Sequence, residues 1–75
     1  MFVDYSYIYH PGKRLSDYGM EQQACIVADY FYLKNYGYVE FAKLRPRLPG
    51  GYFGMIDNTT ILKIREILDG SGIIL

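Results

Sequence analysis

Three side chains with acid–base or metal-binding chemistry lie four residues apart in the middle of the chain. Glu21, Cys25 and Asp29 occupy one row of a predicted helix, because residues at this spacing lie on the same side of a helix. A thiolate between two carboxylates can in principle hold a metal ion, but such sites normally include imidazole ligands. We therefore expect ordinary helix roles, with Glu21 in the first turns and Asp29 bonded to a tyrosine hydroxyl or facing solvent.

The single histidine offers a second combination. His10 precedes Pro11-Gly12 in a predicted turn, and it would be the base for a Cys25 nucleophile in a cysteine–histidine pair. Nothing in the sequence around Cys25 marks a nucleophile, and apolar neighbours on a helix raise the pKa of a thiol. An exposed histidine and a packed thiol are the simpler interpretation, so we predict no catalytic residues and no enzymatic activity for the chain alone.

Two further motifs carry little chemical information. The glycine-rich loop at 49–54 lacks the lysine and serine or threonine of a phosphate-binding loop. Lys43, Arg45 and Arg47 form a small basic cluster, which we interpret as a solvated loop.

Length and composition limit the classes of function. A chain of 75 residues has a core that supplies only roughly 3–5 kcal/mol. Cys25 is the only cysteine, so no internal disulfide forms, and the formal net charge of zero argues against a nucleic-acid-binding surface. No apolar run reaches the about 18 residues of a membrane span, and the N-terminus lacks the pattern of a signal peptide. We expect a cytoplasmic protein with no cofactor and no nucleic-acid or membrane partner.

Tyrosine is unusually abundant, with nine residues in a chain that has no tryptophan. A tyrosine ring is large and apolar with a polar hydroxyl at its tip, so it suits half-buried positions and interfaces. Such residues can cover the thin core of a small domain, or they can form a surface for another chain.

The strongest structural signal is a helix over 17–36. It is predicted to begin between Ser16 and Gly19, with Ser16 or Asp17 as the N-cap. Gly37 is expected to end it, because glycine accommodates the left-handed conformation of a helix C-terminus.

This helix is apolar on nearly every side. From residue 24 to residue 33 only Asp29 is charged, and such a helix is normally buried. So short a chain has few elements to cover it, which predicts a protein partner or a homo-oligomer. Replacing Phe31 by alanine is expected to cost about 3–5 kcal/mol if that ring lies in the core. The predicted core or interface residues are Met20, Ala24, Val27, Tyr30, Phe31 and Leu33.

A second helix is predicted over 58–69, capped by Asp57 or Asn58. Residues 2–9 are rich in aromatic and β-branched types and are predicted to be extended. Residues 38–45 either continue the first helix after a break or form a short strand. The predicted fold class is mainly α, with two principal helices and short extended segments.

The run Arg14-Leu-Ser-Asp-Tyr-Gly-Met-Glu-Gln-Gln-Ala24 is too long and too specific to be a chance helix pattern. With the Ile26-Val-Ala-Asp-Tyr-Phe31 that follows, it resembles a family of bacterial Vgr-related proteins, which are zinc-metallopeptidase-like domains associated with type VI secretion and Rhs elements. The resemblance covers residues 5–38, about half of the chain, and does not extend clearly to 39–75.

The resemblance implies a zinc site that this chain lacks in part. In the family, a His-Glu-x-x-His helix supplies two zinc ligands and a glutamate that activates water. The resemblance places Glu21 at the third ligand, which comes from a later helix. This chain has one histidine and no pair of histidines four apart, so zinc is expected at Glu21 only with ligands from another chain.

We therefore interpret residues 1–75 as one small domain, a noncatalytic remnant or C-terminal part of a type VI secretion-associated protein that acts through protein association. The alternative is a subunit that completes a zinc peptidase site, with Glu21 from this chain and both histidines from a separate polypeptide. A third reading is an independent small binding module. Whether the protein is exported through type VI secretion stays open.

Overall fold

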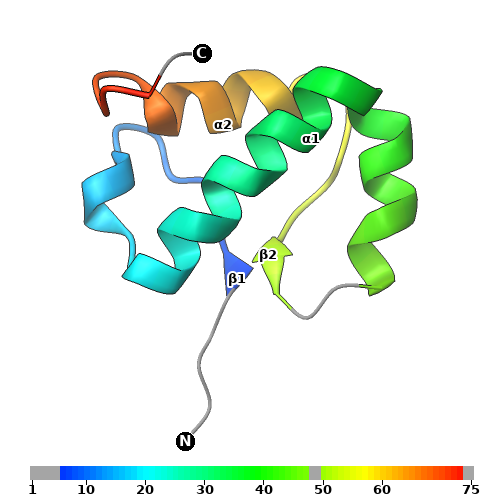
Figure 1. The fold of residues 1–75 in the computed structure, drawn as a ribbon, viewed down its shortest axis with the longest axis horizontal. Helices are drawn as coiled ribbons and strands as arrows, with labels where there is room; N and C mark the ends of the chain where they lie inside the picture. Colours follow the sequence, from blue (N-terminus) through cyan, green and yellow to red (C-terminus); the bar gives the residue numbers. More distant parts are fainter. Residues whose placement is uncertain (1–5, 48–49, 74–75) are drawn as a thin grey trace, which may run out of the picture.

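The computed structural model describes residues 6–47 and 50–73 and shows a mainly α domain with a two-stranded parallel sheet (Figure 1). The predicted fold class is confirmed. Among the described residues, no helix has both the length and the apolarity to cross a membrane. The elements, in chain order, are β1 (Ser6–Tyr7), a 3-10 turn η1 (Leu15–Asp17), α1 (Met20–Leu44), a second 3-10 turn η2 (Arg45–Arg47), β2 (Gly51–Tyr52) and α2 (Thr60–Leu68).

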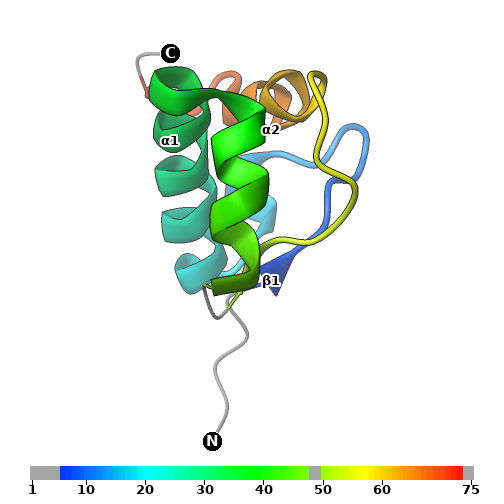
Figure 2. The ribbon, with the colours of Figure 1, turned by 90° about the vertical axis from the view of Figure 1, so that its right-hand side faces the viewer.

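Helix α1 consists of two arms that meet at Gly37. The φ of 87° and ψ of 170° at this residue lie in a region that is essentially restricted to glycine, so the predicted break is confirmed. The chain beyond it continues as a second helical arm, and the strand alternative for 38–45 is wrong. The arms diverge from the turn (Figures 1 and 2), and Tyr32 contacts Phe41 across them, with ring centroids 6.1 Å apart.

The start of α1 differs from the prediction. Ser16 and Asp17 belong to η1, where the Asp17 carboxylate accepts a hydrogen bond from the Arg14 amide (2.9 Å). Gly19 is the N-cap of α1, and its amide donates to Gln22 Oε1 (2.9 Å). The predicted caps are wrong because the aspartate stabilises the preceding turn, and the helix begins only after that turn ends.

The two strands lie side by side although they are far apart in the sequence. Ser6 is opposite Gly51 and Tyr7 is opposite Tyr52 in a parallel register. The Phe53 amide also donates to the Tyr7 carbonyl (2.9 Å). Strands of two residues have little stability of their own, so neighbouring elements must hold them together.

Only part of this pairing was predicted from the sequence. Strand β1 confirms the extended conformation for the end of segment 2–9, while residues 2–5 lie outside the described part. The sequence predicts a glycine-rich loop at 49–54, because Gly50-Gly51 is a turn signal, and strand β2 lies within this segment. Gly51 does have the positive φ of a glycine (97°), but it also pairs with β1.

Helix α2 packs against α1 (Figure 1) and is shorter at both ends than predicted. Thr59 stands at its N-cap. Asp57, one of the predicted caps, accepts a hydrogen bond from the Thr59 amide (2.8 Å), and its own amide donates to Thr60 Oγ1 (2.9 Å). This exchange satisfies backbone donors at the helix entrance.

One apolar cluster forms the core, and α1, α2 and both strands contribute to it. Four tyrosines belong to this cluster, so part of the tyrosine-rich composition serves the interior, whereas Tyr36 and Tyr38 are exposed. Tyr7 packs edge to face against Tyr18 and Tyr52, at centroid distances of 6.1 and 5.8 Å, a favoured aromatic geometry. The buried cluster consists of Tyr7, Tyr18, Ile26, Tyr30, Leu33, Phe41, Tyr52, Ile64, Ile67 and Leu68.

Helix α1 turns only one of its two apolar faces toward this core. Of the six predicted core or interface residues, Tyr30 and Leu33 belong to the buried cluster and Val27 packs against it. Phe31 is 41% exposed, so the expected loss of a fully buried ring does not apply to it. The remaining exposed members of the six are Met20, which is 82% exposed, and Ala24.

Two phenylalanines of α1 provide a matched test of this packing. Phe41 is 0% exposed, so Phe41→Ala should lose about 3–5 kcal/mol and leave the domain largely unfolded. Phe31→Ala should lose less than half as much, because its ring keeps contact with water. Urea denaturation followed by circular dichroism measures both, and an equal loss would show that the burial of these two rings is misassigned.

A second matched pair tests the break in α1. Gly37→Ala forces a Cβ into a glycine-only conformation and should cost about 1–3 kcal/mol. Gly19→Ala is the control, since Gly19 has a φ of −63° that any residue adopts. Thermal unfolding should separate the variants. If both retain the midpoint of the parent protein, the turn between the arms does not need its positive φ.

Candidate functional site

The exposed side of the first arm of α1 is the candidate functional surface. Its residues are Met20, Glu21, Ala24, Cys25 and Ala28, which line an open hollow of about 430 Å³. We call this surface the outer face of α1. Met20, Ala24 and Ala28 are four residues apart and form one row, and the two alanines leave the hollow beside Met20. Glu21 is the only residue of the five with a formal charge.

Glu21, the ligand position implied by the family resemblance, shares the outer face with one other possible ligand, the Cys25 thiol. Glu21 is exposed on the outer face, whereas Asp29 is only 7% exposed and belongs to the inner side of the helix. Among residues 6–47 and 50–73, no three histidine, cysteine, aspartate or glutamate side chains are grouped to hold a metal ion. The donors of the described chain therefore do not fit zinc, which needs at least three protein ligands.

His10 and Cys25 line different cavities. His10 is exposed in a turn, where its carbonyl accepts a hydrogen bond from the Lys13 amide (3.1 Å). Burial raises the pKa of the Cys25 thiol, Asp29 raises it further and Arg45 opposes the rise. A raised pKa keeps the thiol protonated at neutral pH, which agrees with a packed thiol and not with an activated nucleophile.

Asp29 is the acceptor at the centre of the inner side. Its Oδ2 atom accepts hydrogen bonds from the Tyr7 hydroxyl (2.7 Å) and from the Tyr52 amide (3.2 Å). The predicted bond to a tyrosine hydroxyl is thus confirmed, and the backbone bond is an additional finding. One carboxylate oxygen joins α1 to both strands, which explains how strands of only two residues stay paired.

Arg45 completes this arrangement and departs from its predicted role. Its Nε donates to the Tyr52 carbonyl (3.2 Å). Its Nη1 atom lies only 2.9 Å from the position that a Cβ atom on residue 51 would occupy. A glycine at 51 therefore makes room for the guanidinium. The solvated-loop interpretation is wrong for Arg45, which is partly buried, whereas Lys43 and Arg47 are exposed.

We call Asp29, Tyr7, Tyr52 and Arg45 the inner group, and the pKa values of Asp29 and Tyr7 follow from their burial. Burial raises the pKa of Asp29, while the hydrogen bonds from Tyr7 and Tyr52 and the positive charge of Arg45 oppose the rise. Burial also raises the pKa of the Tyr7 hydroxyl strongly, and the neighbouring Asp29 carboxylate adds to it. Tyr7 is therefore a permanent donor at any physiological pH. The group has a structural role, because it is enclosed in the core.

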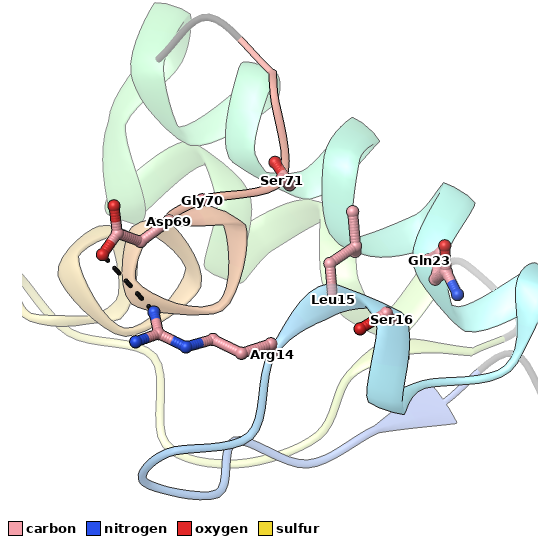
Figure 3. Close-up of a pocket in the computed structure, with 7 residues that line it drawn as sticks. All are labelled: Arg14, Leu15, Ser16, Gln23, Asp69, Gly70 and Ser71. Atoms are coloured by element: carbon pink, nitrogen blue, oxygen red, sulfur yellow. Dashed lines mark hydrogen bonds and ion pairs between the residues drawn. The ribbon is translucent and has the colours of Figure 1, made fainter.

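A separate cavity of about 610 Å³ lies between η1, the start of α1 and the chain after α2 (Figure 3). Arg14 crosses its edge and donates through Nη1 to the Glu66 carbonyl (3.3 Å) and to Asp69 Oδ2 (3.4 Å). These bonds satisfy an acceptor at the end of α2. The lining contains hydroxyls and an ion-paired carboxylate but no histidine, cysteine or glutamate, so it offers no acid–base pair for catalysis.

The comparisons with known proteins agree with the resemblance at a coarse level. A curated protein of Pseudomonas aeruginosa, described as type VI secretion system spike protein VgrG2b, is 45% identical to this chain over 53 residues. The chain is therefore related to a part of a type VI secretion spike protein. No family model matches the chain, and no solved structure matches it.

The extent of this match adds two facts. The alignment covers 64% of this chain, about 48 of its 75 residues, so it must include positions after residue 38. It covers only 5% of the spike protein. The chain thus corresponds to a small part of that relative, and the activity of the whole relative does not transfer to it.

Sequence reasoning missed two residues that matter here. Ala28 belongs to the outer face, and its spacing of four from Ala24 was the available signal. Arg45 belongs to the inner group, and nothing in the local sequence distinguishes it from its basic neighbours. Its position depends on the return of the chain to β2, which no local pattern encodes.

The pH dependence of the free energy of unfolding tests the role of Asp29 in the inner group. The folded pKa of Asp29 is raised above the ordinary value of 3.8, so folding favours the protonated carboxyl. Stability should therefore fall as pH rises from this value through the folded pKa and then level off. Asp29→Asn should abolish that fall, and its single carbonyl oxygen can still accept both hydrogen bonds.

Asp29→Ala instead leaves two buried donors without an acceptor and should cost about 1–3 kcal/mol for each. Glu40→Gln, an exposed carboxylate changed in the same way as Asp29→Asn, is the control. Urea titrations between pH 3 and pH 8 measure all three variants. If Asp29→Asn keeps the parental pH profile, the raised pKa is not the source of the dependence.

Proposed function

We propose that this chain is a noncatalytic part of a type VI secretion spike-related protein and that it acts by binding another polypeptide through the outer face of α1. The observation that supports this proposal is the uncovered apolar surface on its longest helix. Met20 on the outer face is 82% exposed, and Phe31, which lies further along the same helix beyond the hollow, is 41% exposed, although the helix is closely packed on its other side. Exposed apolar surface of this kind is typical of interaction sites.

The relation to the spike protein gives the surface a context. The matched segment is 5% of the relative, so in that protein the corresponding segment belongs to a much longer chain. A face that is covered there would be uncovered in a short chain. The domain nevertheless has its own buried cluster, so it can fold and present the face as a preformed surface.

The alternative function is a subunit of a divided zinc peptidase. One observation favours it: Glu21 is exposed on the outer face, next to the hollow that another helix would occupy. In this reading a separate polypeptide supplies two histidines and the catalytic glutamate, and Glu21 is the remaining ligand. No group of three potential ligands is found among the described residues of this chain, so the alternative depends on that second polypeptide.

Complementation of the relative tests the main proposal. The probe is VgrG2b from which the segment matched by this chain has been deleted, with intact VgrG2b for comparison. The chain should bind the deleted form and not the intact form. Ala24→Arg should abolish binding, because the arginine occupies the hollow, while Ala42→Arg, an exposed alanine on the second arm, should leave it unchanged.

Isothermal titration calorimetry measures binding, and circular dichroism verifies that each variant is folded. Equal binding to both forms, or equal loss with Ala24→Arg and Ala42→Arg, would contradict a specific role of the outer face. Elemental analysis of the complex addresses the alternative. Stoichiometric zinc that disappears with Glu21→Gln would favour the divided peptidase over the noncatalytic part.

A further inference from the structure

The hollow on the outer face of α1 has a shape that suits one class of partner. Ala24 and Ala28 are one turn apart and both are exposed, and Met20 and Cys25 stand beside them around the hollow. Small side chains in a row leave a groove between larger neighbours, and helices pack by placing large side chains of one into such grooves of the other. The hollow therefore accepts bulky apolar side chains.

The size of the face argues against a second copy as the occupant. From Met20 to Phe31 the helix rises by roughly 17 Å, and an α-helix is only about 10–12 Å across. A stable dimer of globular chains buries about 800 Å² on each partner, which is several times the area of such a strip. The strip matches the contact surface of a single helix.

The charge on the face identifies the polar part of the partner. Glu21 is the only formally charged residue that lines the hollow. The ion pairs found in the described ranges join Arg14 to Asp69 and Lys43 to Glu40, and neither involves Glu21. An occupant that covers the hollow brings its own side chain close to this carboxylate, and a cation complements it.

We propose that the outer face of α1 binds one amphipathic α-helix, whose large apolar side chains fill the hollow at Ala24 and Ala28 and whose lysine or arginine pairs with Glu21. This inference rests on the proposed function and adds the class of partner. A contact of this size is weak in isolation, so the helix belongs to a larger polypeptide that other contacts hold close to the chain.

Two designed peptides test the partner class. Both are amphipathic helices of about 18 residues with one leucine stripe, long enough to cover the strip. They differ only at one position beside the stripe, which is lysine in one peptide and glutamate in the other. Fluorescence anisotropy at low salt measures their binding to the full chain and to its variants.

The lysine peptide should bind the parent chain about two- to fivefold more tightly than the glutamate peptide, the range expected for a partly exposed ion pair. Glu21→Lys should reverse this preference. Ala24→Arg should weaken both peptides by about tenfold or more, because it fills the hollow. Ala42→Arg should change neither affinity.

Each other outcome overturns the inference in a distinguishable way. If the two peptides bind the parent chain with equal affinity, and also bind Glu21→Lys with equal affinity, the partner does not need a cation. The outer face would still be a docking surface if Ala24→Arg abolished binding to the deleted spike protein. Failure of both peptides to bind at concentrations up to about 1 mM, where even a weak contact is detected, would exclude a single helix as the occupant. A dimer in sedimentation that Ala24→Arg dissociates would assign the face to a second copy.

Discussion

The fold depends on one buried carboxylate oxygen. Asp29 Oδ2 accepts hydrogen bonds from the Tyr7 hydroxyl on β1 and from the Tyr52 amide on β2. The strands are too short to form a stable sheet by themselves, and their partners in the sequence are more than forty residues apart. The carboxylate is costly to bury, as the raised pKa of Asp29 shows. Two hydrogen bonds and the nearby Arg45 guanidinium offset that cost.

This buried acceptor determines how α1 is oriented. The side of the helix that carries Asp29 also carries Ile26, Tyr30 and Leu33, so fixing the carboxylate between the strands directs those side chains into the core. Helix α2 and the second arm of α1 then cover them from other directions. No further element is left within the described chain to cover Met20, Ala24 and Ala28 on the opposite side. The exposure of the outer face is thus a consequence of a small domain that is organised around one inward-facing polar residue.

The sequence predicted the helices but not the choice between their faces. Apolar runs and turn residues located the starts of both helices to within about three residues, although the predicted caps of α1 were wrong, and Gly37 marked the break between its two arms. Both sides of α1 are apolar, so periodicity alone does not decide which side is buried. Phe31 fits the pattern of a core residue but is 41% exposed. Strand β2 and Arg45 depend on a long-range pairing with β1 that leaves no local signal. The family resemblance predicts Glu21 at the candidate site, and the spacing of Ala28 from Ala24 places both alanines on one row, which the structure shows to be the exposed one.

The two sides of α1 separate the residues that stabilise the domain from those that are proposed to bind a partner. The buried cluster and the Asp29 bonds lie on the inner side of α1. Of the outer face, Cys25 packs against that cluster, whereas Met20, Glu21, Ala24 and Ala28 are exposed. The exposed side chains on the outer face are therefore free to change without unfolding the chain, because surface positions away from buried networks usually affect stability by less than about 0.5 kcal/mol. A rigid helix with an independent core can present such a face without reorganising when a partner arrives, and preorganisation of this kind lowers the entropic cost of association. In the proposed binding role, the limited core of the small domain holds one helix in place while one of its sides stays available.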